Sequence, residues 1–147
     1  MKQKSFLALL GIFFCALFLG CREENISGTW KIESLQKDGV SQEICNIEIQ
    51  VEQKNNTLFI AGDAGVNVFS GDFIVDKNGS ISVNNIALTK MMGSPEEMKF
   101  EDMFVELLNG ISSAHLKDSK LILENKSAKL KAEFSKVQVS TNKTESL

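Results

Sequence analysis

The sequence has little of the chemistry that most enzymes use. Its 147 residues include one His, one Pro, three Cys and no Tyr. A Ser–His–Asp site needs a nucleophile, a base and an orienting carboxylate in contact, and a zinc site needs three or four ligands. His115 has only Ser112, Ser113 and Asp118 as nearby candidates, without a Gly-x-Ser-x-Gly pattern. We therefore expect no catalytic residues, no metal ion and no cofactor.

Other ligand motifs fail on spacing. The segment 76–80 begins like a calcium loop, but its Gly stands at the fourth position and Ala87 replaces the closing Glu. The glycine-rich segment 61–73 lacks the Gly-Lys-Ser/Thr of a phosphate loop and does not lead into a helix pattern. The basic residues form no stripe or cluster after the first residues, so nucleic acid is not an expected partner.

The first twenty residues have the pattern of an export signal. Lys2 and Lys4 give a positive start, and the uncharged apolar run 6–19 follows them. The run ends in Phe-Leu-Gly-Cys at 18–21, which resembles the bacterial lipobox, although the position three before the Cys is commonly Leu. The resemblance implies cleavage before Cys21 and lipid attachment to Cys21, with an uncleaved anchor or an ordinary secretory signal as the alternatives. Acyl chains on Cys21 would tie the chain to a membrane.

Removal of residues 1–20 from the 147 leaves 127 residues, a length that suits one domain. We expect a tether at 21–27, a domain at 28–134 and a polar C-terminal tail at 135–147. The mature chain keeps 14 of its 16 basic residues against 19 acidic ones, for a net charge of −5. We expect a lipid-anchored protein of the bacterial cell envelope. Arg22 after the lipidated Cys is not the Asp associated with inner-membrane retention in enteric bacteria, which favours the outer membrane.

The cysteines leave no disulfide in the mature chain. Cys15 lies in the signal and Cys21 would carry lipid, so Cys45 remains alone. It stands among Ile44, Ile47 and Ile49, and we expect it to be a buried small apolar side chain and not a reactive thiol.

Strand patterns dominate the mature chain. Residues 28–35 and 44–53 alternate apolar and polar side chains, as half-buried antiparallel strands do. Asn78-Gly79 between two apolar segments predicts a tight hairpin turn. After residue 111, the turn residues at 117–120 and 124–127 divide the chain into three short strands.

One segment has the period of a helix. Ser94, Pro95 and Glu97 form a helix start with a capping box, and apolar residues then recur every three or four positions to Ile111. We expect a helix over 95–109 with its acidic residues, including Glu101 and Asp102, on a solvated face. The sequence therefore predicts an α+β fold, in which about eight antiparallel strands form a small, incompletely closed barrel with this inserted helix.

Two sets of residues are candidates for a site. Five apolar side chains of the helix and neighbouring strands are candidate liners of a groove for an acyl chain or an apolar segment of a partner protein: Phe69, Phe73, Phe100, Phe104 and Leu107. The alternative is that they are core residues, because the helix must bury its apolar face. The second set is Gly62, Gly65, Asn67 and Gly71, which we interpret as a bend between strands, with Asn67 bonding the backbone of that bend. A ligand-cradling loop is the alternative.

Several segments, in order, resemble the META domain (HslJ-like) family of bacterial lipoproteins. They are GTWKIESL at 28–35, GDAGVNVFSGDF at 62–73, ISVNNIALTKMMG at 81–93, FVELLNGI at 104–111 and KLILENKSAKLKAEF at 120–134. The resemblance implies the incompletely closed barrel with the helix in its gap. It also implies a non-enzymatic envelope protein that works in binding or in stress-related (heat-shock) envelope maintenance. The alternative function is an assembly or pilot accessory of an envelope or secretion component.

The sequence departs from that family at two cysteines. Val66 and Gly93 stand where many relatives have Cys, and the resemblance implies that those cysteines pair. Without that disulfide, typically worth about 2–4 kcal/mol, we expect a looser connection between the bend and the start of the helix.

Overall fold

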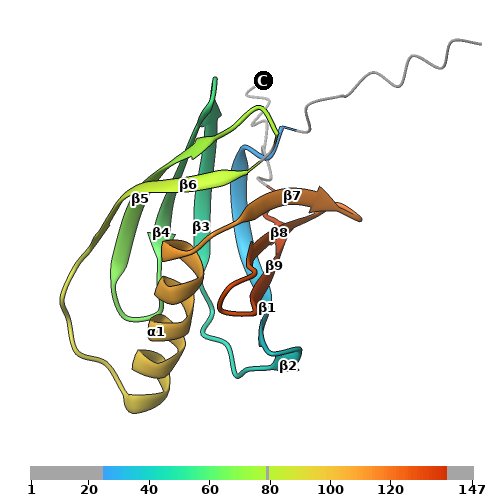
Figure 1. Cartoon of the computed structure of the whole chain (residues 1–147). Coiled ribbons are helices and arrows are strands. Elements are labelled where there is room, and N and C mark those ends of the chain that lie inside the picture. The colour runs from blue at the N-terminus through green and yellow to red at the C-terminus, as the bar shows by residue number, and fades with distance from the viewer. Residues whose placement is uncertain (1–24, 79, 139–147) are drawn as a thin grey trace, which may run out of the picture.

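The computed structural model describes residues 25–78 and 80–138 (Figure 1). The predicted signal peptide, the predicted lipidation site Cys21, the turn residue Gly79 and residues 139–147 lie outside the described residues. Within these ranges one antiparallel sheet curls around one helix.

The sheet has nine strands, eight of which follow one path in the order β6-β5-β4-β3-β1-β9-β8-β7, with the short β2 paired to β1. Six strands precede the helix and three follow it; the three after the helix are those that the sequence predicts. Their bounds are β1 Gly28–Lys37, β2 Val40–Ser41, β3 Glu48–Lys54, β4 Thr57–Asp63, β5 Val68–Val75, β6 Ile81–Leu88, β7 Ser113–Lys117, β8 Lys120–Asn125 and β9 Leu130–Lys136.

The sheet curls because its strands alternate between a buried and an exposed face. In β3, Ile49 and Val51 are buried while Glu48 and Gln50 are exposed. The two ends of the path, β6 and β7, are the edges of the sheet and leave the barrel open between them (Figure 1). The predicted α+β fold, a small incompletely closed barrel with an inserted helix, is confirmed.

The helix α1 spans Pro95–Asn109, as predicted. The Ser94 side chain accepts from the Glu97 backbone N–H and the Glu97 carboxylate accepts from the Ser94 N–H, which completes the capping box. These bonds lower the pKa of the Glu97 carboxyl. The buried face of α1 packs into the barrel, where the Phe104 ring contacts rings from two strands and from α1 itself: Phe69, Phe134 and Phe100.

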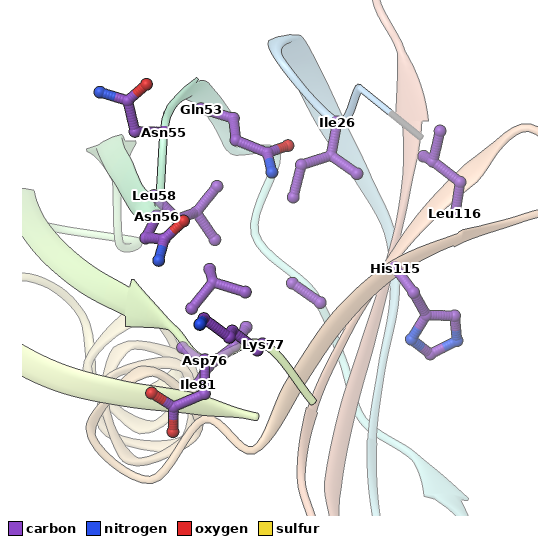
Figure 2. A pocket seen from close by; sticks show the side chains of 12 residues that line it. Ile26, Gln53, Asn55, Asn56, Leu58, Asp76, Lys77, Ile81, His115 and Leu116 are labelled. Carbon is purple, nitrogen blue, oxygen red and sulfur yellow. The ribbon is translucent and has the colours of Figure 1, made fainter. Parts of the chain in front are cut away.

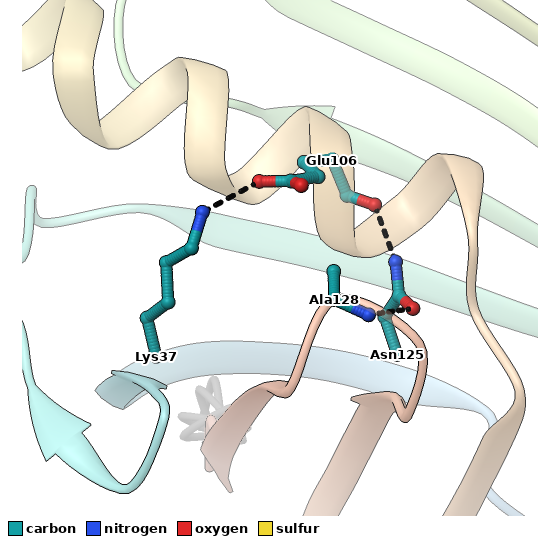
Figure 3. Close-up of polar contacts among 4 residues, drawn as sticks. All are labelled: Lys37, Glu106, Asn125 and Ala128. Carbon is teal, nitrogen blue, oxygen red and sulfur yellow. Dashed lines mark hydrogen bonds and ion pairs between the residues drawn. The ribbon is translucent and has the colours of Figure 1, made fainter.

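The C-terminal end of α1 is fixed to the β8–β9 turn by Asn125 (Figure 3). The Asn125 amide, 4% exposed, donates to the Glu106 carbonyl oxygen at 2.8 Å and accepts from the Ala128 backbone N–H at 3.0 Å. The Glu106 carbonyl also accepts from the Gly110 backbone N–H at 3.3 Å, so Asn125 adds a second, shorter bond at this end of the helix. An ion pair between Lys37 and Glu106, at 3.0 Å, adds a second contact on the exposed side.

The predicted ends of the domain need correction. Ile26 was expected in the tether, but its side chain is 6% exposed, and its carbonyl oxygen accepts from the Trp30 indole N–H at 2.9 Å. At the other end, β9 continues to Lys136, and the Val137 N–H donates to the Thr29 carbonyl. The folded part is thus longer at both ends than the 28–134 expected from strand patterns.

Candidate functional site

A cavity of about 450 Å³ lies at the open end of the barrel, and we call it the barrel-end cavity (Figure 2). Its walls come from the β3–β4 turn, the β5–β6 hairpin, strand β7 and the first described residues of the chain. Twelve residues line it: Ile26, Gln53, Asn55, Asn56, Leu58, Val75, Asp76, Lys77, Ile81, Ala114, His115 and Leu116. Ligand pockets typically have volumes of about 300–1,000 Å³, so the size suits a small ligand or part of a larger one.

The apolar part of the wall comes from inward-facing strand positions. In β7, Ala114 pairs with Leu123 and Leu116 pairs with Leu121, so these two side chains share the face of the buried β8 residues. From the opposite edge, Ile81 at the start of β6 is half-buried. Polar side chains such as Gln53 and Asp76 stand among the liners. Half of the twelve lining residues are apolar and half are polar or charged, so the wall suits a ligand that has an apolar part and a polar part.

The N-terminal end of the described chain is held at the wall of this cavity. Ile26 lines the cavity, and its carbonyl is bonded to the indole of Trp30, which is 1% exposed. The next residue, Ser27, accepts at its Oγ from the backbone N–H of the cavity-lining Gln53 at 3.0 Å. The position at which the chain enters the fold is therefore fixed beside the cavity.

The five predicted groove residues lie elsewhere. Each is at most 3% exposed, and together they fill the core between α1 and the sheet: Phe69, Phe73, Phe100, Phe104 and Leu107. None of them lines the barrel-end cavity. In this structure they are core side chains: Phe100, Phe104 and Leu107 belong to the buried face of α1, and Phe69 and Phe73 belong to β5.

The bend between β4 and β5 is bonded to α1 through a buried carboxylate. Glu101 was expected on a solvated face, but it is 4% exposed. Its Oε2 accepts from the backbone N–H groups of Val66 at 3.0 Å and Asn67 at 2.6 Å, and its Oε1 accepts from Asn67 Nδ2 at 2.7 Å. Three donors replace the water that a buried carboxylate loses.

Asn67 extends this network to the segment before the helix. Its Oδ1 accepts from the Met91 N–H at 2.6 Å and from the Thr89 hydroxyl at 2.9 Å. The side chain therefore bonds neighbouring segments, and not the backbone of its own bend as expected. The Glu101–Asn67 network joins the bend to α1 and to the segment before it, and a connection looser than in relatives with the disulfide stays a prediction.

The three glycines of the bend set permit close backbone approach. Gly62 has φ 153°, and a Cβ there would clash with the Glu48 carbonyl. Gly65 has φ 131° and faces the Phe100 ring. Gly71, in β5, lies opposite Ile60 and Ile86 in the sheet. Their places accord with an architectural role, since a side chain at Gly62 or Gly65 would be strained.

The positions of the two family cysteines are neighbours in space. A Cβ built on Gly93 would overlap the Val66 side chain, although the two residues are far apart in the sequence. Two cysteines there would lie within bonding reach, which agrees with the pairing that the family resemblance implies.

The remaining candidate groups are isolated from one another. His115 is exposed on β7, and Figure 2 shows its ring turned away from the other lining side chains. The hydroxyls of Ser112 and Ser113 donate to Glu124. Cys45 is half-buried, and burial followed by nearby carboxylates raises the pKa of its thiol. Among residues 25–78 and 80–138 we find no group of three His, Cys, Asp or Glu side chains that could hold a metal, and no helix long and apolar enough to span a membrane.

Comparison with known proteins places the chain in a family. The model of the META domain matches residues 24–138. The chain belongs to the META domain family. A search of curated proteins finds no match.

Three solved structures share the fold of this META domain. An NMR structure of a protein from Burkholderia xenovorans has a TM-score of 0.62 and 14% identity, and covers 77% of this chain and 83% of its own. A second NMR structure has a TM-score of 0.56 and 24% identity, with 77% and 92% covered. A crystal structure of a DUF4847 family protein from Bacteroides vulgatus has a TM-score of 0.52 and 16% identity, with 82% and 100% covered. At these identities the similarity shows the fold alone.

Sequence reasoning missed the lining of the barrel-end cavity in this META domain. Leu58 and Ala114 occupy inward strand positions, and alternation identifies such positions. Alternation does not tell which end of the barrel is open. Strand order could have located the cavity. The strands β6 and β7 are the two edges of the sheet and do not pair with each other, so the barrel is open between them.

Proposed function

We propose that this META domain protein is a lipid-anchored, non-enzymatic protein of the cell envelope that works by binding an apolar ligand. The observation that carries the proposal is the barrel-end cavity, whose lining includes six apolar side chains and the start of the described chain. The Phe-Leu-Gly-Cys segment that ends in Cys21 supports the anchor. The resemblance to the family's lipoproteins suggests envelope maintenance under stress as the role, and Arg22 after Cys21 favours the outer membrane as the location.

The ligand class follows from the lining. Ile81, Ala114 and Leu116 are half-buried apolar liners, so affinity would come from their apolar area removed from water, at about 25 cal/mol per Å². The donors of the wall, such as the Gln53 amide and the Lys77 ammonium, suit a ligand with one polar end. An acyl chain with its carboxylate or ester, or an apolar segment of a partner protein, has this shape.

The experiment is a titration of the full mature chain with Cys21→Ser, which removes the lipid attachment site. Palmitate and apolar peptides are added, and the fluorescence of Trp30, the one Trp in the sequence, is followed. Trp30 reports on the cavity because its indole is bonded to Ile26 in the cavity wall. We expect a saturable change in emission.

Two variants make the titration specific. Ala114→Phe fills the cavity and should abolish the response, whereas Ala87→Phe, at an exposed position of β6, should keep it. No saturable binding by any of these ligands would contradict the proposed function, as would equal binding by both variants.

A second candidate function, an assembly or pilot accessory, is favoured by an exposed apolar surface. Val68, Met91 and Met92 are 50%, 54% and 95% exposed. Methionine is common at surfaces that bind protein partners because its side chain is flexible and polarizable. This function predicts that one envelope component co-purifies with the protein, and that a Met91→Gln, Met92→Gln double variant loses it. Unchanged co-purification by the double variant would remove this candidate.

A further inference from the structure

The lipid attachment site predicted from the sequence is close to the barrel-end cavity. Cys21 stands five residues before Ile26, whose side chain lines the cavity. An extended chain spans at most about 3.6 Å per residue, so the Cys21 Cα stays within about 18 Å of the Ile26 Cα in any conformation. An acyl chain on Cys21 therefore has the cavity within its reach.

Two hydrogen bonds hold the start of the described chain at the cavity wall. Ile26 is bonded through its carbonyl to the Trp30 indole, and Ser27 is bonded to the backbone of Gln53 in the cavity wall. Because both bonds lie at the start of β1, the chain cannot leave the cavity wall without breaking the first contacts of the folded domain.

We propose that the barrel-end cavity holds one acyl chain of the lipid on Cys21 of the same molecule. This inference rests on the proposed function, because it requires that Cys21 is lipidated. A ligand joined by a short tether has an effective concentration in the millimolar range, which favours the protein's own lipid over a free fatty acid. The cavity volume of about 450 Å³ suits one chain, so any further chains on Cys21 remain for the membrane.

The test is photocrosslinking within the lipidated protein. Cells that express the full chain are grown with a fatty acid that carries a diazirine, and the protein is purified in detergent, irradiated, digested and analysed by mass spectrometry. We expect the N-terminal peptide to be crosslinked to peptides that contain Leu58, Ile81 or Ala114, with a yield independent of protein dilution. Ala114→Phe should lose these crosslinks and Ala87→Phe should keep them.

The source of the acyl chain is tested in a second arm. Cys21→Ser protein is irradiated with vesicles of phosphatidylethanolamine and phosphatidylglycerol that carry the same diazirine. Labelling of the cavity peptides here, as strong as in the lipidated protein, would overturn the inference in favour of bilayer lipid. Crosslinks spread over the surface, or kept by Ala114→Phe, would also overturn it.

The mass of the N-terminal peptide separates the two proposals. A lipidated Cys21 without cavity crosslinks contradicts this inference alone and leaves the anchor standing. A Cys21 that carries no lipid contradicts the anchor of the proposed function and this inference together.

Discussion

Glu101 is the buried carboxylate that joins α1 to the bend, and its removal should strongly destabilise the domain. In Glu101→Ala, three N–H donors lose their acceptor: the backbone groups of Val66 and Asn67, and the Asn67 side chain. Val66 is half-buried, so water can replace that bond, and Asn67 Nδ2 keeps a weaker bond to the Met91 carbonyl at 3.3 Å. The buried Asn67 N–H is left without a partner.

The magnitude follows from these three donors. A hydrogen bond to a charged group contributes about 1.5–3 kcal/mol, and a buried unsatisfied donor costs about 1–3 kcal/mol. Allowing for partial replacement by water, we expect Glu101→Ala to lower the free energy of unfolding by about 3–4 kcal/mol. With an unfolding entropy of about 2.1 cal/mol/K per residue, a domain of this size should lose about 12–16 °C in Tm.

The assay is urea and thermal unfolding followed by circular dichroism. The matched control is Asp102→Ala, which removes the neighbouring carboxylate from an exposed position of the same helix. It should change stability by less than about 0.5 kcal/mol. Glu101→Gln should fall between the two, because its amide keeps one acceptor but points donors at the Asn67 amide. If Glu101→Ala and Asp102→Ala were equally stable, the Glu101 network would have no part in holding the helix.

Three further predictions follow from single contacts. Val66→Cys with Gly93→Cys should form a disulfide in an oxidising buffer, seen as the loss of two free thiols, because a Cβ on Gly93 meets the Val66 side chain; two thiols that stay free after oxidation would show that the segments are apart. Cys45 should react slowly with iodoacetamide at pH 7 and faster at higher pH or in guanidinium, because burial raises its thiol pKa and the thiolate is the reactive form; equal rates in folded and unfolded protein would contradict this. Asn125→Ala should lower the free energy of unfolding by about 1–3 kcal/mol in urea, because its bonds to the Glu106 carbonyl and from the Ala128 N–H are both lost, at about 0.5–1.5 kcal/mol each; a change below about 0.5 kcal/mol would mean that water replaces these bonds.

Local signals in the sequence predict the elements of this fold well. The capping box needs only Ser94 and Glu97, three positions apart, and both bonds form. The strands before and after the helix follow from alternation and turn residues, because each strand has one face in the core. In these segments the local signals and the packing of the core favour the same structure.

The burial of Glu101 could not be predicted in the same way. The sequence shows a carboxylate at the border of an apolar helix face, and most such groups are solvated. Its donors lie 34 and 35 positions away in the bend, and only the folded chain brings them together. The apolar face of α1 gave a similar difficulty, since periodicity shows that Phe104 is buried but not whether a ligand or the core covers it.

The structure divides the barrel into a fixed part and an open end. The helix is bonded to the β4–β5 bend by Glu101 and to the β8–β9 turn by Asn125, so the gap between the sheet edges is closed where the helix lies. The barrel-end cavity lies where β6 begins and β7 ends, between the same two edges but beyond the described contacts of the helix. The start of the described chain is bonded beside that cavity through Ile26. The Glu101 and Asn125 contacts thus hold the part of the barrel that the helix closes. The open end lies next to the start of the described chain, which is the arrangement that binding of an acyl chain on Cys21 would require.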